Sequence, residues 1–296
     1  MPFAGSMSGN AGNPPESSDP YGKKKGGNTT MYALVAIMLV VGLVAGYVIG
    51  ASLAKPAETN DDLDKILERG QLFVASDTTW APFEIYNPDT EQYEGVDIEI
   101  AQRIADELGV ELVIKPMGWD AVLAAAQAGQ ADIAISSITI TPDRAESVDF
   151  SDPYYESNQA ILVKSGSDIN SIGDLDGKKI GCQMATTGAI WVDEHLVQTG
   201  NISAADFVQY NDIPSAIASL DQGTVDAVIC DTPVARNYEK NEDYDFRVAI
   251  VITTNEEYGI EIAQGNLALK YAINDILAEM KEDGSLEAIL VKWDCI

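Results

Sequence analysis

Arginine is scarce in this sequence, and Arg144, one of five arginines, stands where it could bind an anion. The planar guanidinium of an arginine can hold a carboxylate through two parallel hydrogen bonds. Thr141-Pro142 precede it as the expected N-cap and first residue of a helix, so free backbone N–H groups would add donors for the same anion. Arg144 is therefore a candidate carboxylate anchor, and an ordinary exposed arginine is the alternative.

Two further polar side chains, Ser137 and Asp231, are related by an internal repeat. Residues 126–137 (AQAGQADIAISS) align with residues 220–231 (LDQGTVDAVICD) at a constant offset of 94, and each reads as helix, glycine stop, aspartate and buried strand. Both side chains would end a parallel strand, where open α/β sheets bind ligands. We expect two lobes of similar topology whose strand ends face each other, although a helix N-cap is an alternative role for Asp231.

A third candidate is the helix start at Thr186-Thr187, which follows the strand expected at residues 179–182. Its hydroxyls and backbone N–H groups could bind a carboxylate. Threonines at a helix start are also common caps, so a purely structural role is the alternative.

The elements that must position these residues alternate between strands and helices. Strands separated by helices of 10 to 15 residues predict parallel α/β sheets. The expected strands are 71–76, 111–115, 131–135, 179–182, 206–210 and 226–230, and the expected helices are 96–108, 120–128, 187–197, 213–220 and 266–280, with further helices starting at Pro142 and Thr232.

Five segments, in order, resemble the amino-acid-binding proteins of ABC importers, solute-binding family 3, which includes glutamine, histidine and lysine/arginine/ornithine binders. The resemblance covers residues 65 to 294, and the closing Lys292-Trp293 fits it too. The segments are residues 74–84 (VASDTTWAPFE), 95–100 (GVDIEI), 136–144 (SSITITPDR), 149–155 (DFSDPYY) and 258–260 (YGI).

The resemblance implies a two-lobed α/β fold, periplasmic-binding-protein-like (type II), with a hinge of two crossing strands. Lobe one is expected at residues 56–157 and 254–296, and lobe two at residues 158–253. Such a protein closes around an amino acid and hands it to an ABC permease, so it needs no cofactor or metal. We expect a monomer.

The resemblance also assigns roles to the candidate residues. Arg144, with Thr186 and Thr187 from lobe two, would bind the ligand's carboxylate. Asp231 would accept the α-ammonium group, with Ser137, Ile138 and Thr139 completing its surroundings. A buried zwitterion needs partners for both of its charges.

Four residues remain for the ligand's side chain: Asp77, Trp80, Phe83 and Trp119. Aromatic faces and a carboxylate suit a basic side chain through cation-π attraction and a salt bridge. The same set could hold glutamine, and Trp119 could belong to the core. We expect a polar or basic amino acid.

Charge divides the chain into two parts. The formal net charge is −29, but residues 1–54 carry +1 and residues 55–296 carry −30. Residues 31–54 contain no charge and as a helix would span about 36 Å, enough to cross a membrane. Lys23 to Lys25 before this span would place a disordered tail, residues 1–30, in the cytoplasm and the acidic part outside. A cleavable signal peptide is the alternative, but the apolar segment is long for one.

Other functions are less consistent with the sequence. Such an acidic chain would repel nucleic acid, and a single histidine, His195, leaves little material for imidazole catalysis. A dehydratase on the same fold would need a general acid, for which Glu84 or Asp77 could be proposed. A sensory receptor lobe is a further alternative, but it would need a cytoplasmic output domain. Cys182 and Cys230 are expected to be buried thiols, with a disulfide as the alternative.

Overall fold

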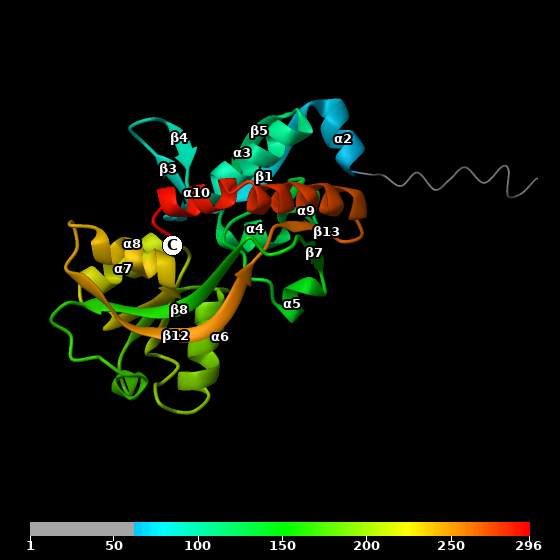
Figure 1. The fold of residues 1–296 in the computed structure, drawn as a ribbon. Helices are drawn as coiled ribbons and strands as arrows, with labels where there is room; N and C mark the ends of the chain where they lie inside the picture. Colours follow the sequence, from blue (N-terminus) through cyan, green and yellow to red (C-terminus); the bar gives the residue numbers. More distant parts are fainter. Residues whose placement is uncertain (1–61) are drawn as a thin grey trace, which may run out of the picture. The chain divides into compact units, whose positions relative to one another are not determined.

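A computed structural model describes residues 62–296. The predicted tail and transmembrane helix lie outside the described residues. Within residues 62–296, no helix combines the length and apolar character needed to cross a membrane. The described residues form two five-stranded sheets with helices packed on them, and a small three-stranded sheet (Figure 1).

The first sheet has the strand order β5-β1-β6-β13-β7. Strand β1 pairs in parallel with β5 and β6, whereas β13 runs antiparallel to β6 and β7. We call this sheet and the helices packed around it lobe one. Its strands are β1 (Gln71–Ser76), β5 (Glu111–Pro116), β6 (Ile133–Ala134), β7 (Val148–Phe150) and β13 (Glu261–Ala263), and the small sheet is β2 (Thr79–Trp80), β3 (Glu84–Asn87) and β4 (Gln92–Glu94).

The second sheet has the order β10-β9-β11-β8-β12 and defines lobe two. Strand β9 pairs in parallel with β10 and β11, and β8 runs antiparallel to β11 and β12. Its strands are β8 (Tyr155–Lys164), β9 (Ile180–Gln183), β10 (Phe207–Tyr210), β11 (Ala227–Asp231) and β12 (Phe246–Tyr258).

Helices cover both sheets. In lobe one, the long α9 packs against α2, α3 and α10 (Figure 1). The helices of lobe one are α2 (Asp62–Arg69), α3 (Val96–Leu108), α4 (Trp119–Ala125), α5 (Pro142–Ala145), α9 (Leu267–Glu282) and α10 (Ser285–Lys292). Those of lobe two are η1 (Ile172–Leu175), α6 (Thr187–Val192), η2 (Asp193–Val197), α7 (Ile213–Asp221) and α8 (Thr232–Lys240).

The internal repeat corresponds to equivalent places in the two sheets. Strands β6 and β11, which carry the repeated sequence, are each the central strand of their sheet. On one side each has two parallel strands, and on the other side it has an antiparallel neighbour followed by a strand that is antiparallel to that neighbour. The predicted parallel pairing holds for three strands of each sheet, and the other two pair antiparallel because the chain enters and leaves lobe two through them or directly beside them.

Several predicted helices have different lengths in the structure. Helix α3 has the predicted bounds. The residue before it, Gly95, has φ 130°, and a Cβ there would lie 2.1 Å from the carbonyl oxygen of Phe83, so this position requires a glycine. The helix starting at Pro142 has only four residues, and the one predicted at 187–197 changes to a π-helical turn after Val192. Sequence periodicity does not show such local changes of winding.

Strands β8 and β12 pair along most of their length and connect the two lobes (Figure 1). Their register shifts between Ile252 and Glu256, where the side-chain oxygen of Asn158 accepts hydrogen bonds from the backbone N–H groups of Thr254 and Asn255. Asn255 has φ 50°, in the left-handed region. This irregularity is a bulge, and bulges re-aim the side chains that follow them.

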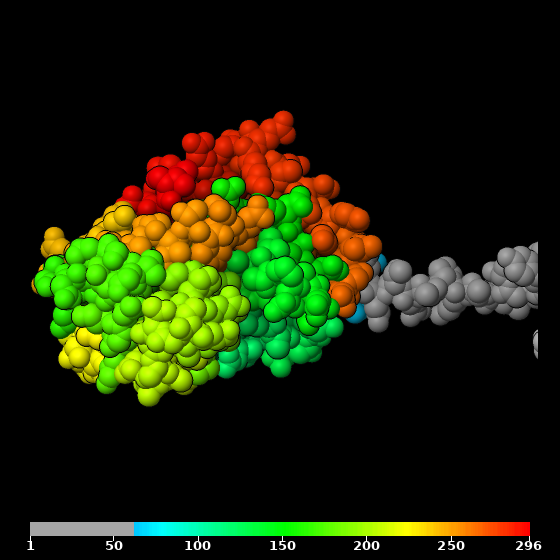
Figure 2. Space-filling view, turned by 90° about the horizontal axis from the view of Figure 1, so that it is seen from below, coloured from blue at the N-terminus to red at the C-terminus, as the bar shows by residue number. Residues whose placement is uncertain are grey.

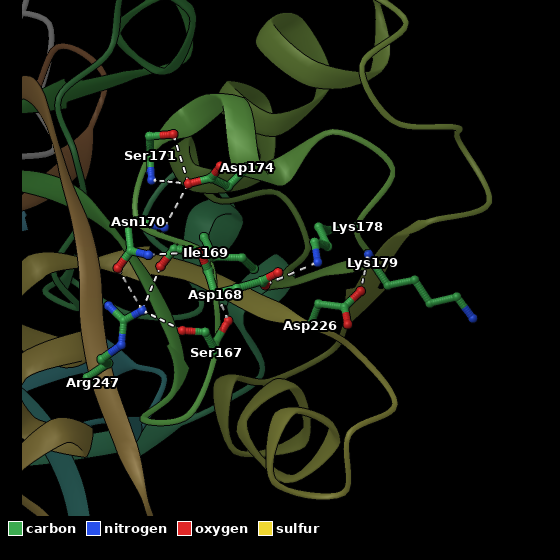
Figure 3. A network of polar contacts seen from close by, with 10 residues as sticks. All are labelled: Ser167, Asp168, Ile169, Asn170, Ser171, Asp174, Lys178, Lys179, Asp226 and Arg247. Carbon is green, nitrogen blue, oxygen red and sulfur yellow. Dashed lines mark hydrogen bonds and ion pairs between the residues drawn. The ribbon is translucent and has the colours of Figure 1, made fainter.

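The loop after β8 is fixed to β12 by Arg247 (Figure 3). Its guanidinium donates to the carbonyl oxygens of Ser167 at 3.0 Å and Ile169 at 2.7 Å, and to the side chain of Asn170 at 3.1 Å. Asp174 closes the next turn by accepting from Ser171. These contacts stabilise the loop that follows β8 in lobe two.

Candidate functional site

A pocket lies between the two lobes and is lined by residues from both. Figure 2 shows one face on which the yellow-green surface that carries α6 meets the green surface of lobe one. Lobe one lines the pocket with Asp77, Trp80, Glu84, Trp119, Ser136, Ser137, Thr139 and Arg144, and lobe two with Gln183, Thr186, Thr187 and Asp231.

Nine of the eleven predicted site residues line this pocket, and Phe83 and Ile138 do not. Phe83 is fully buried, with its ring 5.1 Å from that of Tyr155 and 5.3 Å from that of Tyr258, both edge to face. Ile138 is fully buried in the core of lobe one, where its carbonyl accepts from the N–H of Gly259. Both residues therefore belong to the core and do not line the pocket.

Arg144 reaches into the pocket from the short helix α5. The side chain of Thr141 caps this helix by accepting from the Arg144 N–H at 3.2 Å, as predicted. The guanidinium donates to the carbonyl oxygen of Thr139 at 2.7 Å and lies 5.4 Å from the ring of Trp119. Burial lowers the pKa of Arg144 and the charge of Glu261 opposes this, but an arginine stays charged in proteins.

The carbonyl oxygen of Ala185, in lobe two, forms hydrogen bonds with two side chains of lobe one. It accepts hydrogen bonds from Trp119 Nε1 at 3.2 Å and from Arg144 Nη2 at 3.3 Å. Ala185 has φ 58°, a conformation that costs an alanine about 1 kcal/mol. The position thus has the conformation that a glycine would adopt without strain.

Asp77 and Gln183 form a second contact between the lobes. Gln183 Nε2 donates to Asp77 Oδ2 at 2.7 Å and to the carbonyl oxygen of Asn211, and Thr79 donates to Asp77 Oδ1 at 2.9 Å. Burial raises the pKa of Asp77, and the hydrogen bonds from Gln183 and Thr79 oppose this. Gln183 was not among the predicted residues, although it ends strand β9 and the rule that selected Asp231 could have selected it.

Asp231 ends the central strand of lobe two and is 6% exposed. Tyr258 donates to its Oδ2 at 2.5 Å, Gln159 donates to its Oδ1, and its side chain does not cap α8. Burial and then the charge of Glu256 raise the pKa of Asp231 to about 7. The helix-cap alternative therefore does not describe this carboxylate.

A pair of buried acids, Glu84 and Asp97, lies beneath the strand end of β6. Glu84 accepts from the hydroxyls of Ser136 at 2.8 Å and Ser137 at 3.2 Å, and Asp97 accepts from the N–H of Ser137 at 2.6 Å. Burial and the charge of Asp97 raise the pKa of Glu84 well above its usual value, and burial raises that of Asp97 to about 7. Glu84 and Ser136 lie inside segments that the sequence analysis singled out.

The two threonines at the start of α6 have different partners. Thr186 caps the helix, since its hydroxyl donates to the carbonyl of Gln183 at 2.8 Å and accepts from the N–H of Ala189 at 3.2 Å. The hydroxyl of Thr187 donates to Glu256 Oε2 at 2.7 Å. The structural alternative therefore holds for the hydroxyl of Thr186. Across residues 62–296, no cluster of acids, cysteines and histidines forms a potential metal site.

The fold and this pocket are those of a two-lobed solute-binding protein. Residues 72–294 match the profile of the bacterial extracellular solute-binding proteins, family 3. The chain belongs to this family.

Relatives with known names are similar over most of their length. The L-cystine-binding protein TcyJ of Escherichia coli K12 is 34% identical over 263 residues, which cover 88% of this chain and 94% of the relative. A probable histidine-binding protein of Neisseria gonorrhoeae is 34% identical over 224 residues, covering 74% and 81%.

Solved structures agree with the fold. A mutant of ArgBP from T. maritima has a TM-score of 0.72 at 31% identity, covering 79% of this chain and 99% of that one. An ancestral arginine-binding protein bound to glutamine has a TM-score of 0.70 at 38% identity, covering 76% and 98%. Both support the two-lobed architecture.

Proposed function

We propose that this protein captures a polar or basic amino acid between its lobes and delivers it to an ABC-type permease. The observation that carries the proposal is one closed pocket lined by Arg144 from lobe one and by the buried Asp231 from lobe two. An arginine and an aspartate in one desolvated site match the carboxylate and the ammonium of an amino acid.

The proposed arrangement follows from the chemistry of each group. The carboxylate of the ligand would bind Arg144, and its ammonium group would bind Asp231 and the oxygens of Ser137 and Thr139. Thr186 and Thr187 would contribute through their backbone N–H groups, because their hydroxyls donate to other oxygens. Asp77, Trp80 and Trp119 would surround the side chain.

An excess of carboxylates around the pocket supports a polar or basic ligand. Asp77, Glu84 and Asp231 line the pocket, which has Arg144 as its cation. A ligand side chain with hydrogen-bond donors would find acceptors here, whereas an acidic side chain would be repelled. The names of relatives, which include arginine-, glutamine- and histidine-binding proteins, are consistent with this class.

Binding would be coupled to closure, because the pocket residues come from both lobes. A ligand favours the closed form only by interacting more strongly with it than with the open form. Strands β8 and β12 would act as the hinge, with lobe boundaries near residues 157 and 254. The binding part would lie outside the membrane, held by a helix over residues 31–54.

Isothermal titration of the purified protein against the twenty standard amino acids tests the proposal. One or a few polar or basic amino acids should bind, with heat that saturates at one ligand per chain. If none of the twenty binds, the proposed class, a polar or basic standard amino acid, is wrong. Preference for an acidic or aliphatic amino acid would leave the fold intact but contradict the assignment around Asp77.

A dehydratase is the second candidate, and one observation favours it. Glu84 lines the pocket, and burial and the charge of Asp97 raise its pKa well above its usual value, which is the direction that a general acid requires. One similar structure is an ancestral amino-acid-binding protein described as a precursor of cyclohexadienyl dehydratase, with a TM-score of 0.69 at 34% identity, covering 79% of this chain and 99% of that one. Incubation with a cyclohexadienyl substrate and detection of water loss by mass spectrometry tests this candidate.

A further inference from the structure

Glu256, which the sequence analysis did not single out, contacts both lobes at the edge of the pocket. It is only 9% exposed. Its Oε2 accepts from the hydroxyl of Thr139 in lobe one at 2.7 Å and from the hydroxyl of Thr187 in lobe two at 2.7 Å. Its Oε1 accepts from Gln159 Nε2 at 2.9 Å. One carboxylate oxygen therefore links side chains from opposite sides of the cleft.

The bulge in β12 places Glu256 in this position. The register with β8 shifts between Ile252 and Glu256, and Asn158 holds the bulged backbone through Thr254 and Asn255. Beyond the bulge, Glu256 is buried while Glu257 is exposed. The bulge thus directs one acidic side chain toward the cleft and its neighbour toward solvent.

The two hydroxyls that donate to Glu256 can face a ligand only as acceptors. A threonine hydroxyl has one hydrogen and two acceptor lone pairs. Thr139 and Thr187 each direct that hydrogen to Glu256, and both line the pocket. The hydroxyl of Thr187 also accepts from Gln159 Nε2 at 3.2 Å. The lone pairs that remain on the two hydroxyls suit a cationic donor such as an ammonium group, whereas a carboxylate would be repelled.

The same network includes Asp231. Gln159 donates through one nitrogen to Asp231 and to Glu256, so its amide holds the two carboxylates next to each other. Two carboxylates and two acceptor-oriented hydroxyls then surround one corner of the pocket. Such a corner has a strong preference for positive charge.

We infer that Glu256 is a positioning residue, which orients the hydroxyls of Thr139 and Thr187 as acceptors for the ligand's ammonium group and so makes ammonium binding depend on closure. The inference rests on the proposed function. Both hydroxyls reach Glu256 only when the lobes are together, so the complete acceptor set exists only in the closed form. That difference in interaction between open and closed forms is what a ligand needs in order to drive closure.

The test compares Glu256→Gln with Glu257→Gln in the full chain, titrated with L-arginine and L-glutamine and with the 2-hydroxy acid analogues of both. A glutamine at 256 has nearly the same shape but replaces one acceptor oxygen with an NH₂ donor, so it cannot accept from Thr139, Thr187 and Gln159 with separate oxygens as the carboxylate does. We expect E256Q to weaken binding of the amino acids about 10- to 100-fold. Binding of the 2-hydroxy acids, which lack the ammonium group, should weaken less than about threefold, and E257Q should match the wild type.

A second pair of variants covers the case in which E256Q does not fold. Thr187→Val keeps the shape of the side chain and removes the hydroxyl, whereas Thr187→Ser keeps the hydroxyl. T187V should reproduce the loss of amino-acid affinity, and T187S should retain affinity close to that of the wild type. The inference would be overturned if T187V and T187S lost equal affinity for the amino acids. It would also be overturned if E256Q lost equal affinity for the amino acids and the 2-hydroxy acids.

A ligand-free measurement separates this inference from the proposed function. The charge of Glu256 helps to raise the pKa of Asp231 to about 7. E256Q should therefore lower the pKa of Asp231, because the other groups around this carboxylate are unchanged. An NMR titration of the Asp231 carboxyl carbon measures this pKa. If the wild type binds neither L-arginine nor L-glutamine, those two ligands are excluded, and this titration, which needs no ligand, still decides whether Glu256 occupies the corner. An unchanged pKa in E256Q would refute that placement.

Discussion

The charged side chains of the pocket depend on one another for their properties. Arg144 lies among several acids, and the charges of Glu261, Asp231 and Glu256 offset the effect of burial on its pKa. Burial in turn raises the pKa of Glu261 to about 8, which the charge of Arg144 opposes. A change at either kind of residue should therefore alter ligand binding beyond the loss of one contact.

Replacement of Arg144 by lysine tests the carboxylate anchor while retaining the positive charge. Lysine cannot form two parallel hydrogen bonds with a carboxylate, and it cannot span both the Thr139 and Ala185 carbonyls. We expect amino-acid affinity to fall about 100-fold, or roughly 3 kcal/mol. Isothermal titration measures this, with Arg236→Lys as the control, since Arg236 forms a surface ion pair with Glu239. Retained affinity in R144K would show that the carboxylate binds elsewhere.

Protonation of Asp231 should make ligand binding depend on pH. Its pKa of about 7 in the ligand-free protein means that protons compete with the ligand's ammonium group below neutral pH. Affinity should be constant above pH 8 and should fall by up to about tenfold per pH unit below pH 6.5. Titrations between pH 5 and 8.5 measure this dependence, and Asp231→Asn should weaken binding and flatten the profile. A flat wild-type profile would contradict this assignment of the ammonium partner.

Adjacent strands place the two buried cysteines on opposite faces of the second sheet. Cys182 in β9 belongs to one core cluster and Cys230 in β11 to another. Both are free thiols, and burial raises the pKa of Cys182 to about 12 and that of Cys230 well above its usual value. The pairing of adjacent strands therefore does not bring their sulfur atoms together.

Alkylation tests whether Cys182 and Cys230 are free, buried thiols. We expect iodoacetamide at pH 8 to leave Cys182 and Cys230 unmodified in the native protein, because thiolate is the reactive form. Both should react once guanidinium chloride has unfolded the chain, with no need for a reductant. Mass spectrometry of peptides reads the result. A peptide pair that separates only after reduction would show a disulfide between Cys182 and Cys230.

The turn between β9 and α6 allows a test of backbone strain. Since Ala185 has φ 58°, Ala185→Gly should stabilise the protein by up to about 1 kcal/mol, although the added freedom of the unfolded chain offsets part of this. The matched control is Ala218→Gly in the exposed face of α7, which should destabilise by about 0.5–1 kcal/mol. Urea unfolding measures both. Equal destabilisation in the two variants would mean that Ala185 is not left-handed in solution.

Taken as a whole, the ligand-free molecule keeps several acids in surroundings that favour their protonated form. The pKa values of Asp97 and Asp231 are raised to about 7 and that of Glu261 to about 8, in each case chiefly by burial. In the unfolded chain these groups would titrate near pH 4. Between about pH 4 and pH 8 the folded state therefore binds more protons than the unfolded state, so the free energy of unfolding rises as pH falls.

We therefore expect the thermal midpoint of the ligand-free protein to rise by several degrees between pH 8 and pH 5.5. The net charge of −29 adds to this, since partial protonation reduces repulsion among the acids. Calorimetry at several pH values measures the midpoint, and a second series in 0.5 M salt screens the surface contribution. If the rise disappears in salt, the surface charge causes it and the buried acids do not.

The sequence by itself determined the order of elements, the equivalence of the two lobes and most of the candidate site. Helical and strand periodicities are local properties, so α3 and β1 have their predicted bounds. The repeat between residues 126–137 and 220–231 predicted two lobes of similar topology, and the repeated strands are the central strands of the two sheets, with Ser137 and Asp231 lining one pocket. Nine pocket residues were predictable because they lie at helix starts, at strand ends or within segments shared with a family.

Tertiary structure alone decided which side chains meet across the cleft. Glu256 lies 117 residues from Thr139 and 69 from Thr187 along the chain, yet it accepts from both. The bulge that aims it depends on pairing between β8 and β12, and neither strand shows that pairing by itself. Phe83 was assigned to the pocket because an aromatic face suits a basic side chain, but packing against Tyr155 and Tyr258 buries it in the core. Local patterns specify elements, whereas long-range packing and desolvation select the partners of each side chain.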